Sequence, residues 1–412
     1  RPAPAGGGPV PAGGGPVRGR RPRRLPRAPL GPGRVRRLAF RQLLRADVGA
    51  PAGFGLAIDA GGLVVAAGAA AVLGLDARTA VERWRRPGAR GAWLESGALH
   101  LLEAGRLAAV DAASGRERWA RPAAELPDGG AAGPAVVRLA GGVALWVGSD
   151  AAAALDPAAG RVLWRFVPPA GRALRAAAAG RLALVGSAAG FLYALDAATG
   201  APAWRVRLPG PLAAPPAVHG DALLALCATD LGGSLLALEP DTGRRRFELP
   251  LDVTPTGPLL SFAGLLAVPG AVAGDPVVAA LDPAGALAWE DAPPLGPGPV
   301  ALAPAPGGLL VKSPGGACLA LDRGGGVLWS RARPPAADAE VNVPPVVARG
   351  VALVAGDGVE ALELDTGRPL GEARLGAPAR LAADGALDVW ALDATGALAA
   401  ARLSTHLSLV GG

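Results

Sequence analysis

The chain contains no methionine, and lysine, tyrosine, asparagine and glutamine occur once each, at Lys312, Tyr193, Asn342 and Gln42. Without a methionine the chain does not include its own initiator, so we expect a processed product or a piece of a longer protein. Arginine stands almost everywhere for lysine, and alanine is abundant. This composition is typical of a GC-rich genome and indicates no structural demand.

Cysteine is nearly as scarce. Cys227 and Cys318 lie on separate strand-like segments, too far apart in the chain for us to expect the short distance that a disulfide requires. They are typical of small buried apolar residues. A framework of disulfides is therefore excluded, and the cysteines leave the redox compartment open.

Long apolar runs are also missing. The longest uncharged stretch, residues 253–274, is interrupted by Pro255, Pro258 and Pro269. Residues 60–75 are too short for a membrane span of about 20 residues and contain four glycines. No segment sustains an apolar period of 3.6 residues, so we expect few helices and no transmembrane segment.

The positive charge is confined to one end. Residues 1–46 hold 12 arginines and no acid, although the whole chain has a net charge of only +7. The remainder is therefore slightly acidic, and the folded body is not predicted to bind nucleic acid specifically. The basic segment, which is rich in Pro and Gly, predicts a disordered linker that makes at most weak contacts with an anionic surface.

One motif recurs about every forty residues, a period typical of solenoids and propellers. Residues 194–204 read Ala-Leu-Asp-Ala-Ala-Thr-Gly-Ala-Pro-Ala-Trp, and clear copies stand at 74–84, 109–119 and 154–164. Looser copies follow at 237–247, 280–289, 320–329 and 361–371, and a shorter ninth copy surrounds Asp393. The acidic position of the motif is occupied by Asp76, Asp111, Asp156, Asp196, Glu239, Asp282, Asp322 and Glu363.

Each unit predicts an antiparallel sheet of four short strands joined by glycine-bearing turns. In the fourth unit we expect strands over 180–187, 191–195 and 203–208, and the next unit begins with a strand over 214–218. The fold class is therefore all-β, a propeller of four-stranded antiparallel blades. Eight blades fit best, with seven or nine still open. Terminal strands that share one sheet close the ring and limit exposed sheet edges, and residues 35–44 resemble an outer strand.

The motif has a physical explanation. The Asp carboxylate can accept bonds from backbone N–H groups two or three residues ahead, and glycine provides the positive φ that ends the turn. An aromatic ring on the following strand can then fill the space between blades. The residues expected to dock the blades are Asp76, Trp84, Asp111, Trp119, Asp156, Trp164, Asp196, Thr199, Gly200, Trp204, Glu239, Phe247, Asp282, Trp289, Asp322 and Trp329. Gly371 and Ala400 hold no ring, so the last repeats should be the loosest, and a replacement at Gly371 should cost less stability than Trp204→Ala.

These residues match the docking motif of pyrroloquinoline-quinone-type propeller repeats over roughly residues 50–400, and the chain resembles that superfamily. The resemblance implies one of two branches: quinone-dependent dehydrogenases, or non-catalytic propellers of the BamB type, a scaffold of outer-membrane β-barrel assembly. The enzyme branch implies a calcium-bound quinone with Glu and Asn ligands, an Asp base and two adjacent bridged cysteines. Only Asn342 is available, and no acidic cluster accompanies it.

Other candidate groups favour structural roles. His100, His219 and His406 have no metal spacing and are expected on the surface or in loops. Arg205 with Arg207, and the group at 244–246, are expected to be solvated, with no aromatic platform for single-stranded nucleic acid. Glycine runs such as 324–326 lack the features of a phosphate loop. We therefore predict no catalytic, cofactor-binding or metal site and no cofactor.

Three functions follow in order of preference. The first is a non-catalytic module, monomeric as a propeller, that binds a protein partner on one rim. The second is a ligand-sensing domain of a larger regulatory or envelope protein, and the third is a quinone-dependent dehydrogenase. The resemblance favours the periplasm or cell envelope and leaves the cytoplasm open. We divide the chain into a linker with a short strand near its end (1–47), a propeller (48–405) and a tail (406–412).

Overall fold

The computed structural model describes residues 37–59, 61–95, 97–127, 135–138, 143–169, 172–291, 295–296, 298–314, 317–332, 342–384 and 388–406. Residues 36–407 form one compact unit. Most of the predicted linker and most of the tail lie outside the described residues, so the predictions about them stay predictions. Over the described ranges, regular structure consists of strands and a single 3-10 turn, η1 (Ala123–Glu125).

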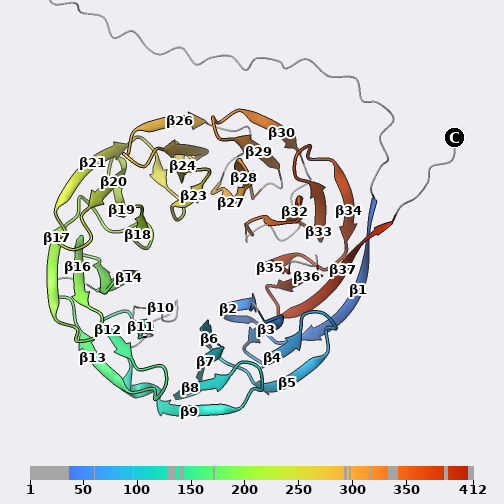
Figure 1. Cartoon of the computed structure of the whole chain (residues 1–412), viewed down its shortest axis with the longest axis horizontal. Coiled ribbons are helices and arrows are strands. Elements are labelled where there is room, and N and C mark those ends of the chain that lie inside the picture. Colours follow the sequence, from blue (N-terminus) through green and yellow to red (C-terminus); the bar gives the residue numbers. More distant parts are fainter. Residues whose placement is uncertain are drawn as a thin grey trace, which may run out of the picture. The chain divides into compact units, whose positions relative to one another are not determined.

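The strands form sheets that follow one another around a ring, here numbered as blades in chain order (Figure 1). Blade 1 contains β2 (Pro51–Ile58), β3 (Leu63–Gly68), β4 (Ala71–Asp76) and β5 (Glu82–Pro87). Blade 2 contains β6 (Gly91–Glu95), β7 (Ala98–Glu103), β8 (Arg106–Asp111) and β9 (Glu117–Pro122). Blade 3 contains β10 (Ala135–Arg138), β11 (Ala144–Val147), β12 (Ala152–Leu155) and β13 (Val162–Phe166).

The next three blades continue the pattern. Blade 4 contains β14 (Ala173–Ala179), β15 (Leu182–Ser187), β16 (Phe191–Asp196) and β17 (Pro202–Arg207). Blade 5 contains β18 (Ala217–His219), β19 (Ala222–Thr229), β20 (Gly232–Leu238) and β21 (Arg245–Leu251). In blade 6 the innermost strand is split into β22 (Thr254–Pro255) and β23 (Leu260–Phe262), followed by β24 (Leu265–Val272), β25 (Asp275–Leu281) and β26 (Leu287–Asp291).

The last blades bring the two ends of the chain together. Blade 7 contains β27 (Ala301–Ala305), β28 (Gly308–Lys312), β29 (Cys318–Asp322) and β30 (Val327–Arg331). Blade 8 contains β31 (Val346–Ala348), β32 (Val351–Ala355), β33 (Val359–Glu363) and β34 (Pro369–Ala373). Blade 9 contains β35 (Pro378–Ala383), β36 (Asp388–Asp393), β37 (Ala397–His406) and, as its outer strand, β1 (Arg37–Asp47).

The predicted propeller class is thus present, but the preferred number of eight blades is wrong. The described residues form nine sheets, the alternative that the sequence left open. The short ninth copy builds a full blade because β1 pairs antiparallel with β37 along ten residue pairs, from Arg37 opposite His406 to Asp47 opposite Ala397. The predicted closure by terminal strands is confirmed, and the outer strand expected at 35–44 is β1.

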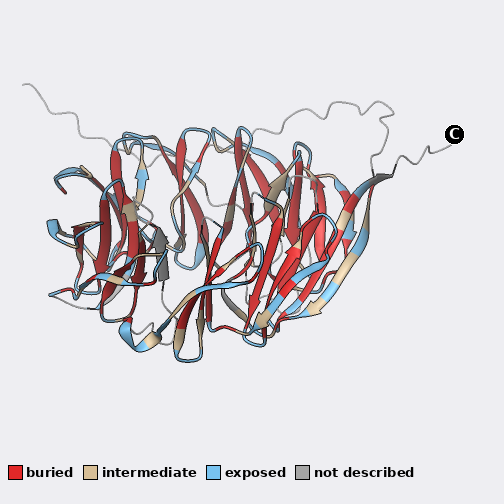
Figure 2. Cartoon of the chain, turned by 60° about the horizontal axis from the view of Figure 1, so that its bottom comes forward, coloured by how far each residue is buried: buried red, intermediate tan, exposed pale blue. Residues whose placement is uncertain are grey.

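Burial explains why these segments become strands. The two middle strands of a blade lie between neighbouring blades and are covered on both faces, so β15 is buried along its whole length. Such strands are continuous apolar runs. Outer strands instead alternate, and β17 is exposed at every second residue over its second half. Figure 2 shows buried inner strands between exposed loops, and the apolar core is a series of layers, each shared by two adjacent blades.

The third and outer strands of all nine blades share a bulge at the equivalent place. The bulge sets the ring residue opposite a small residue, as Trp204 lies opposite Ala194. In blade 9 the same register places Leu44 opposite Ala400. Ala400 therefore does not occupy the ring position to which the sequence assigned it. Leu44 on the N-terminal strand occupies that position.

Gly371, in blade 8, also differs from the expectation of an empty position. A Cβ at Gly371 would lie 2.3 Å from the carbonyl oxygen of Leu38 on β1. A backbone atom cannot move aside as a side chain can, so a replacement at Gly371 has a steric cost, and the expectation that it costs less than Trp204→Ala stays a prediction. β1 fills the space that a ring fills elsewhere.

Candidate functional site

The antiparallel topology gives the ring two different rims. Turns between first and second strands, and between third and outer strands, lie on one rim, which we call the turn rim. Turns between second and third strands and the connections between blades lie on the other, the linker rim. Blade edges at both rims are formed by exposed loops (Figure 2).

The Asp-x-x-Thr-Gly segments build the turn rim. In blade 4, Asp196 Oδ1 accepts the backbone N–H groups of Ala198 (3.1 Å) and Thr199 (3.0 Å) and the hydroxyl of Thr199 (2.9 Å). Gly200 follows with φ of 72°. These hydrogen bonds lower the pKa of Asp196. In blade 2 the pKa of Asp111 is lowered to about 2. The largest cause is its hydrogen bond to the Arg118 guanidinium, and the next are its hydrogen bonds to Ser114.

The aromatic ring of one blade contacts the turn of the next. Trp204 Nε1 donates to the carbonyl oxygen of Pro240 (2.9 Å), the residue that follows Glu239. The equivalent acceptors are Ala112 for Trp84, Pro157 for Trp119, Ala197 for Trp164, Arg323 for Trp289 and Leu364 for Trp329. Phe247 has no N–H, and its ring lies against Gly285. The energetic importance of these contacts stays a prediction.

The groups that a quinone and calcium would need do not come together. Among the described residues, no three His, Cys, Asp or Glu side chains gather as metal ligands. Cys227 and Cys318 are buried free thiols in different interblade layers, and burial raises the pKa of each to about 12. The side chains that the structure describes therefore do not fit that cofactor.

The single asparagine has a structural environment. The Asn342 amide nitrogen donates to the carbonyl oxygens of Pro299 (2.8 Å) and Lys312 (3.1 Å), and its oxygen accepts from Lys312 Nζ (2.9 Å). Lys312 is itself buried at the end of β28. These bonds tie the connections before and after blade 7 together at the linker rim, which leaves the amide no oxygen directed at an incoming cation.

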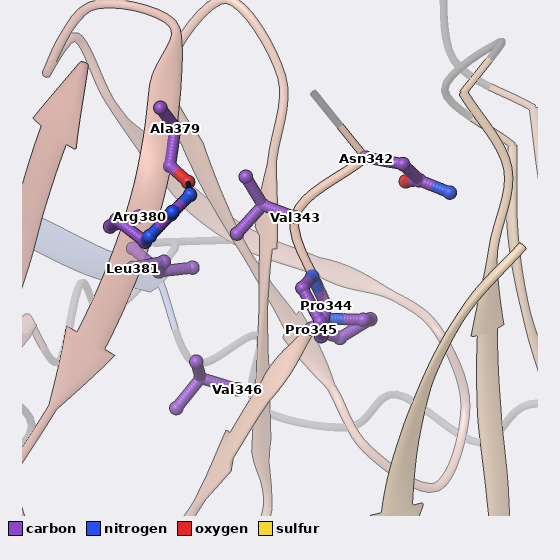
Figure 3. A pocket seen from close by; sticks show the side chains of 8 residues that line it. All are labelled: Asn342, Val343, Pro344, Pro345, Val346, Ala379, Arg380 and Leu381. Carbon is purple, nitrogen blue, oxygen red and sulfur yellow. Dashed lines mark hydrogen bonds between the residues drawn. The ribbon is translucent and has the colours of Figure 1, made fainter. Parts of the chain in front are cut away.

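A pocket of about 330 Å³ lies beside this connection, between the first strands of blades 8 and 9. Figure 3 shows the residues that line it: Asn342, Val343, Pro344, Pro345, Val346, Ala379, Arg380 and Leu381. The Asn342 amide points away from Arg380 (Figure 3). Arg380 donates to the carbonyl oxygen of Ala379 (2.8 Å). The lining is mainly apolar with one cation and no carboxylate, so it suits a small apolar or anionic group better than a metal ion.

The histidines differ from one another. His100 on β7 is buried, which contradicts its expected surface position, and its ring lies 5.7 Å from that of Trp119. Burial lowers its pKa, and Arg118 adds to the effect. His219 is partly exposed, with Nδ1 3.3 Å from the Ser261 hydroxyl. The side chain of His406 lies outside the described residues.

The two arginine groups have different partners. Arg244 pairs with Glu239, Arg245 with Glu248, and Arg246 with Asp221 at 2.9 Å.

Arg205 and Arg207 instead lie over the ring of Phe191, with guanidinium carbons 5.8 and 5.4 Å from its centroid. An aromatic side chain therefore accompanies them, but both guanidinium groups lie over its ring, so the expectation that no aromatic platform for single-stranded nucleic acid is present stays a prediction. The signal in the sequence was the pair Phe191 and Tyr193 on the neighbouring strand. The strands must be aligned in register before this pair can be matched to the arginines.

The fold and its recurring turn sites define a nine-bladed β-propeller of PQQ-like repeats. The family described as "Outer membrane protein assembly factor BamB" matches residues 148–276 and 274–411, more than half of the chain. The chain belongs to this family. A search of curated protein sequences finds no significant match.

Solved structures agree on the fold. BamB from Moraxella catarrhalis is 19% identical with a TM-score of 0.55, and the match covers 89% of this chain and 99% of that one. Quinohemoprotein alcohol dehydrogenase from Comamonas testosteroni is 16% identical with a TM-score of 0.53, covering 88% and 76%. Dihydro-heme d1 dehydrogenase NirN is 14% identical with a TM-score of 0.56, covering 82% and 79%. At such identities the similarity concerns the fold alone.

Among the described residues, no helix has the length and apolar character needed to cross a bilayer.

Proposed function

We propose that the chain is a non-catalytic interaction module of the cell envelope, which presents the surface of its propeller to a protein partner. The observation that carries the proposal is the use of its polar groups. The turn carboxylates are bonded within their own turns, and the single asparagine is bonded to Lys312 and Pro299. The engagement of these described groups in structural contacts favours function through the outer surface and the rims.

Membership of the BamB family supports this proposal and the envelope location. The dehydrogenases of similar fold represent the competing activity. Because the same propeller serves both, the fold alone does not select between them. The donor set selects against the quinone, since a hard cation requires several converging oxygen ligands.

The first test is direct. The purified chain is mixed with pyrroloquinoline quinone and calcium, binding is measured by calorimetry, and alcohol and sugar oxidation is followed with a dye acceptor. We expect neither binding nor turnover. Stoichiometric quinone binding together with dye reduction would overturn the proposal.

The second test concerns the partner. A photo-crosslinking residue is placed, one position at a time, at exposed sites of the full chain in its native host. The sites cover the turn rim, the linker rim and the outer wall. We expect one region to yield a discrete protein adduct, identified by mass spectrometry. If none of the three regions gives such an adduct, the role as a protein-interaction module is wrong.

The pocket beside Asn342 favours a second candidate, a ligand-sensing role. Its apolar lining and Arg380 would suit a small carboxylate with an apolar body. A thermal-shift screen with aliphatic and aromatic carboxylates tests this role, and shifts that persist in Arg380→Gln would count against it.

A further inference from the structure

The outer wall of the ring contains a cluster of aromatic and basic side chains where blades 3 and 4 diverge. We call it wedge 3/4 and define it by Phe166 on β13, Phe191 and Tyr193 on β16, and Arg205 and Arg207 on β17. Tyr193 is buried, and its ring centroid lies 5.2 Å from that of Phe166 and 6.1 Å from that of Phe191. The ring of Phe191 thereby extends a buried aromatic contact outward to the surface.

The strand register explains why the arginines meet this ring. Phe191 lies opposite Arg207 and Tyr193 opposite Arg205, so these four side chains share one face of the sheet. That face is the one toward blade 3, since Tyr193 contacts Phe166. Both arginines are exposed, and both guanidinium groups lie within 6 Å of the Phe191 centroid, the range of a cation–π contact.

Two equivalent wedges contain ion pairs. Between blades 7 and 8, Arg331 pairs with Glu360 at 2.5 Å, on the positions that Phe166 and Tyr193 occupy in wedge 3/4. Between blades 1 and 2, Arg86 pairs with Glu103 at 3.2 Å. In each case an acid of the next blade satisfies an arginine of the preceding outer strand.

In wedge 3/4 no acid does so. Within the part of the chain that the structure describes, no carboxylate forms an ion pair with Arg205 or Arg207. The surrounding sequence is also one-sided, because residues 157–220 contain seven arginines and a single acid, Asp196. Asp196 lies in its turn on the other rim, where Thr199 occupies it.

A guanidinium that rests on a ring is held in place while its N–H groups stay available. Arginine can then bind a carboxylate through two parallel hydrogen bonds. Arg205 and Arg207 stand two residues apart on an outer strand whose only partner in the sheet is β16. Alternate side chains of an extended chain have the same spacing, so two carboxylates at positions i and i+2 would match them.

We propose that wedge 3/4 and the free edge of β17 bind an extended acidic segment of a protein partner, with two carboxylates at alternate positions. This inference rests on the proposed function and names its contact surface and the chemistry of its partner. Main-chain pairing along the strand edge would add affinity, as in other cases of strand addition.

Other anions fit this surface less well. A membrane surface attracts a cluster of about four to eight basic residues, whereas two arginines here share a single ring. Single-stranded nucleic acid needs a free aromatic face for each stacked base, and the guanidinium groups already lie over Phe191.

The test uses the full chain and a fluorescent peptide in which glutamate alternates with valine or threonine. Binding is measured by anisotropy, with the matched glutamine peptide as reference. We expect the double variant Arg205→Gln/Arg207→Gln to weaken binding of the acidic peptide about five- to tenfold, from two exposed charge-assisted contacts. Phe191→Leu should weaken it about twofold to fivefold, because the cation–π contacts that hold the guanidinium groups are lost.

The matched control is Arg41→Gln/Arg45→Gln, which removes the same charge from the outer strand β1 and should leave affinity unchanged. All variants must retain the melting temperature of the unmodified chain. An equal loss of peptide affinity in the two double variants would show that binding depends on net charge rather than on this surface. That result would overturn the inference. No binding of the acidic peptide up to about 1 mM would do the same.

Three further probes separate the alternatives. Phosphatidylserine vesicles or a thymidine oligonucleotide that bind more tightly than the peptide, with the same dependence on Arg205 and Arg207, would assign the wedge to another anion. Self-association in the ultracentrifuge that disappears in the Arg205→Gln/Arg207→Gln variant would assign it to a second copy. Either result contradicts the inference.

The partner found by crosslinking separates a failure of the proposed surface from a failure of the proposed function. If that partner binds the Arg205→Gln/Arg207→Gln variant with unchanged affinity, this surface is wrong and the interaction function stands. If no partner protein is crosslinked from any region, the function itself is wrong.

Discussion

Blades 1 to 7 and the closing blades 8 and 9 solve the same packing problem differently. In the first group a Trp or Phe on the outer strand contacts the turn of the next blade. In blade 8 the ring position is Gly371, and in blade 9 it is Leu44. The difference shows that the ring is absent from blade 8, where the next blade has no such turn, whereas blade 1 keeps its Asp76 turn although it faces Leu44, with Ala80 in place of the glycine.

The physical reason is the closure. The third and outer strands of blade 9 come from opposite ends of the chain, so no turn joins them. A ring on blade 8 would have no turn to contact, and β1 passes there instead, with its Leu38 carbonyl close to Gly371.

Blade 9 compensates on another strand. Trp390 lies on β36 opposite Ala400, which in turn lies opposite Leu44. It is fully buried in the layer between blades 9 and 1, which also contains Ala80. In blade 9 the large ring therefore lies on the second strand. In blades 1 to 7 the ring lies on the outer strand of the equivalent cross-strand row.

The largest expected effect comes from removing the closing strand. Deletion of residues 1–47 removes β1 and exposes the edge of β37, which we expect to cost about 5–15 kcal/mol, from roughly ten strand hydrogen bonds at about 0.5–1.5 kcal/mol each. Deletion of residues 1–36 should leave the melting temperature unchanged. Thermal unfolding and size-exclusion chromatography compare the two, and equal stability of both truncations would contradict the role of β1.

Trp204→Ala should cost about 3–5 kcal/mol, because a large ring between blades 4 and 5 is replaced by a cavity and its bond to Pro240 is lost. Urea unfolding measures the change. The control is Leu231→Ala, at a residue that is 93% exposed, where we expect almost no effect. A similar loss for both would show that the rings do not hold the blades together.

A glycine exchange sharpens the comparison at smaller magnitude. A Cβ at Gly200 would lie 2.6 Å from the Trp164 ring, and φ there is 72°. Gly200→Ala should therefore cost about 1–3 kcal/mol. The equivalent turn residue of blade 1 is Ala80, which has φ of 57° and lies in the layer that holds Leu44 in place of a ring.

Ala80→Gly serves as the reciprocal variant. It relieves the positive φ of a non-glycine residue and is expected to be neutral or slightly stabilising. If the two substitutions shift the urea midpoint equally and in the same direction, the ring does not determine where glycine is required.

The smallest effect concerns pH. His100 lies on the second strand, at the position that Trp390 takes in blade 9. Because burial lowers its pKa in the folded state, the unfolded chain binds a proton first as the pH falls through about 6.5. The free energy of unfolding should therefore fall from pH 7 toward pH 5. In His100→Leu this part of the pH dependence should vanish, whereas an unchanged pH profile would contradict the assignment.

Strand by strand, local sequence anticipated much of the fold. The strands expected at 180–187, 191–195 and 203–208 are β15, β16 and β17, with ends that differ by at most two residues. Blade 9 was misjudged because Asp393 ends the second strand, β36, although its surroundings resemble a turn that follows a third strand. The residues around Asp393 are compatible with both turns, and pairing with β1 decides between them.

Wedge 3/4 likewise depends partly on local sequence and partly on tertiary structure. Phe191, Tyr193, Arg205 and Arg207 are all visible in the sequence, but their meeting depends on register and on the divergence of two blades. His100 was expected on the surface because a single histidine does not reveal the ring of Trp119 above it.

The repeat alone determined that the chain is a propeller with acid-capped turns and aromatic outer strands, because these features depend on residues close together in the chain. Blade number, the position of Leu44, the burial of His100 and, among the described residues, the lack of an ion pair to Arg205 and Arg207 were decided by the tertiary structure. Each of them depends on which distant strands share a sheet or an interblade layer, and closure of the ring brings the two ends of the chain into one blade.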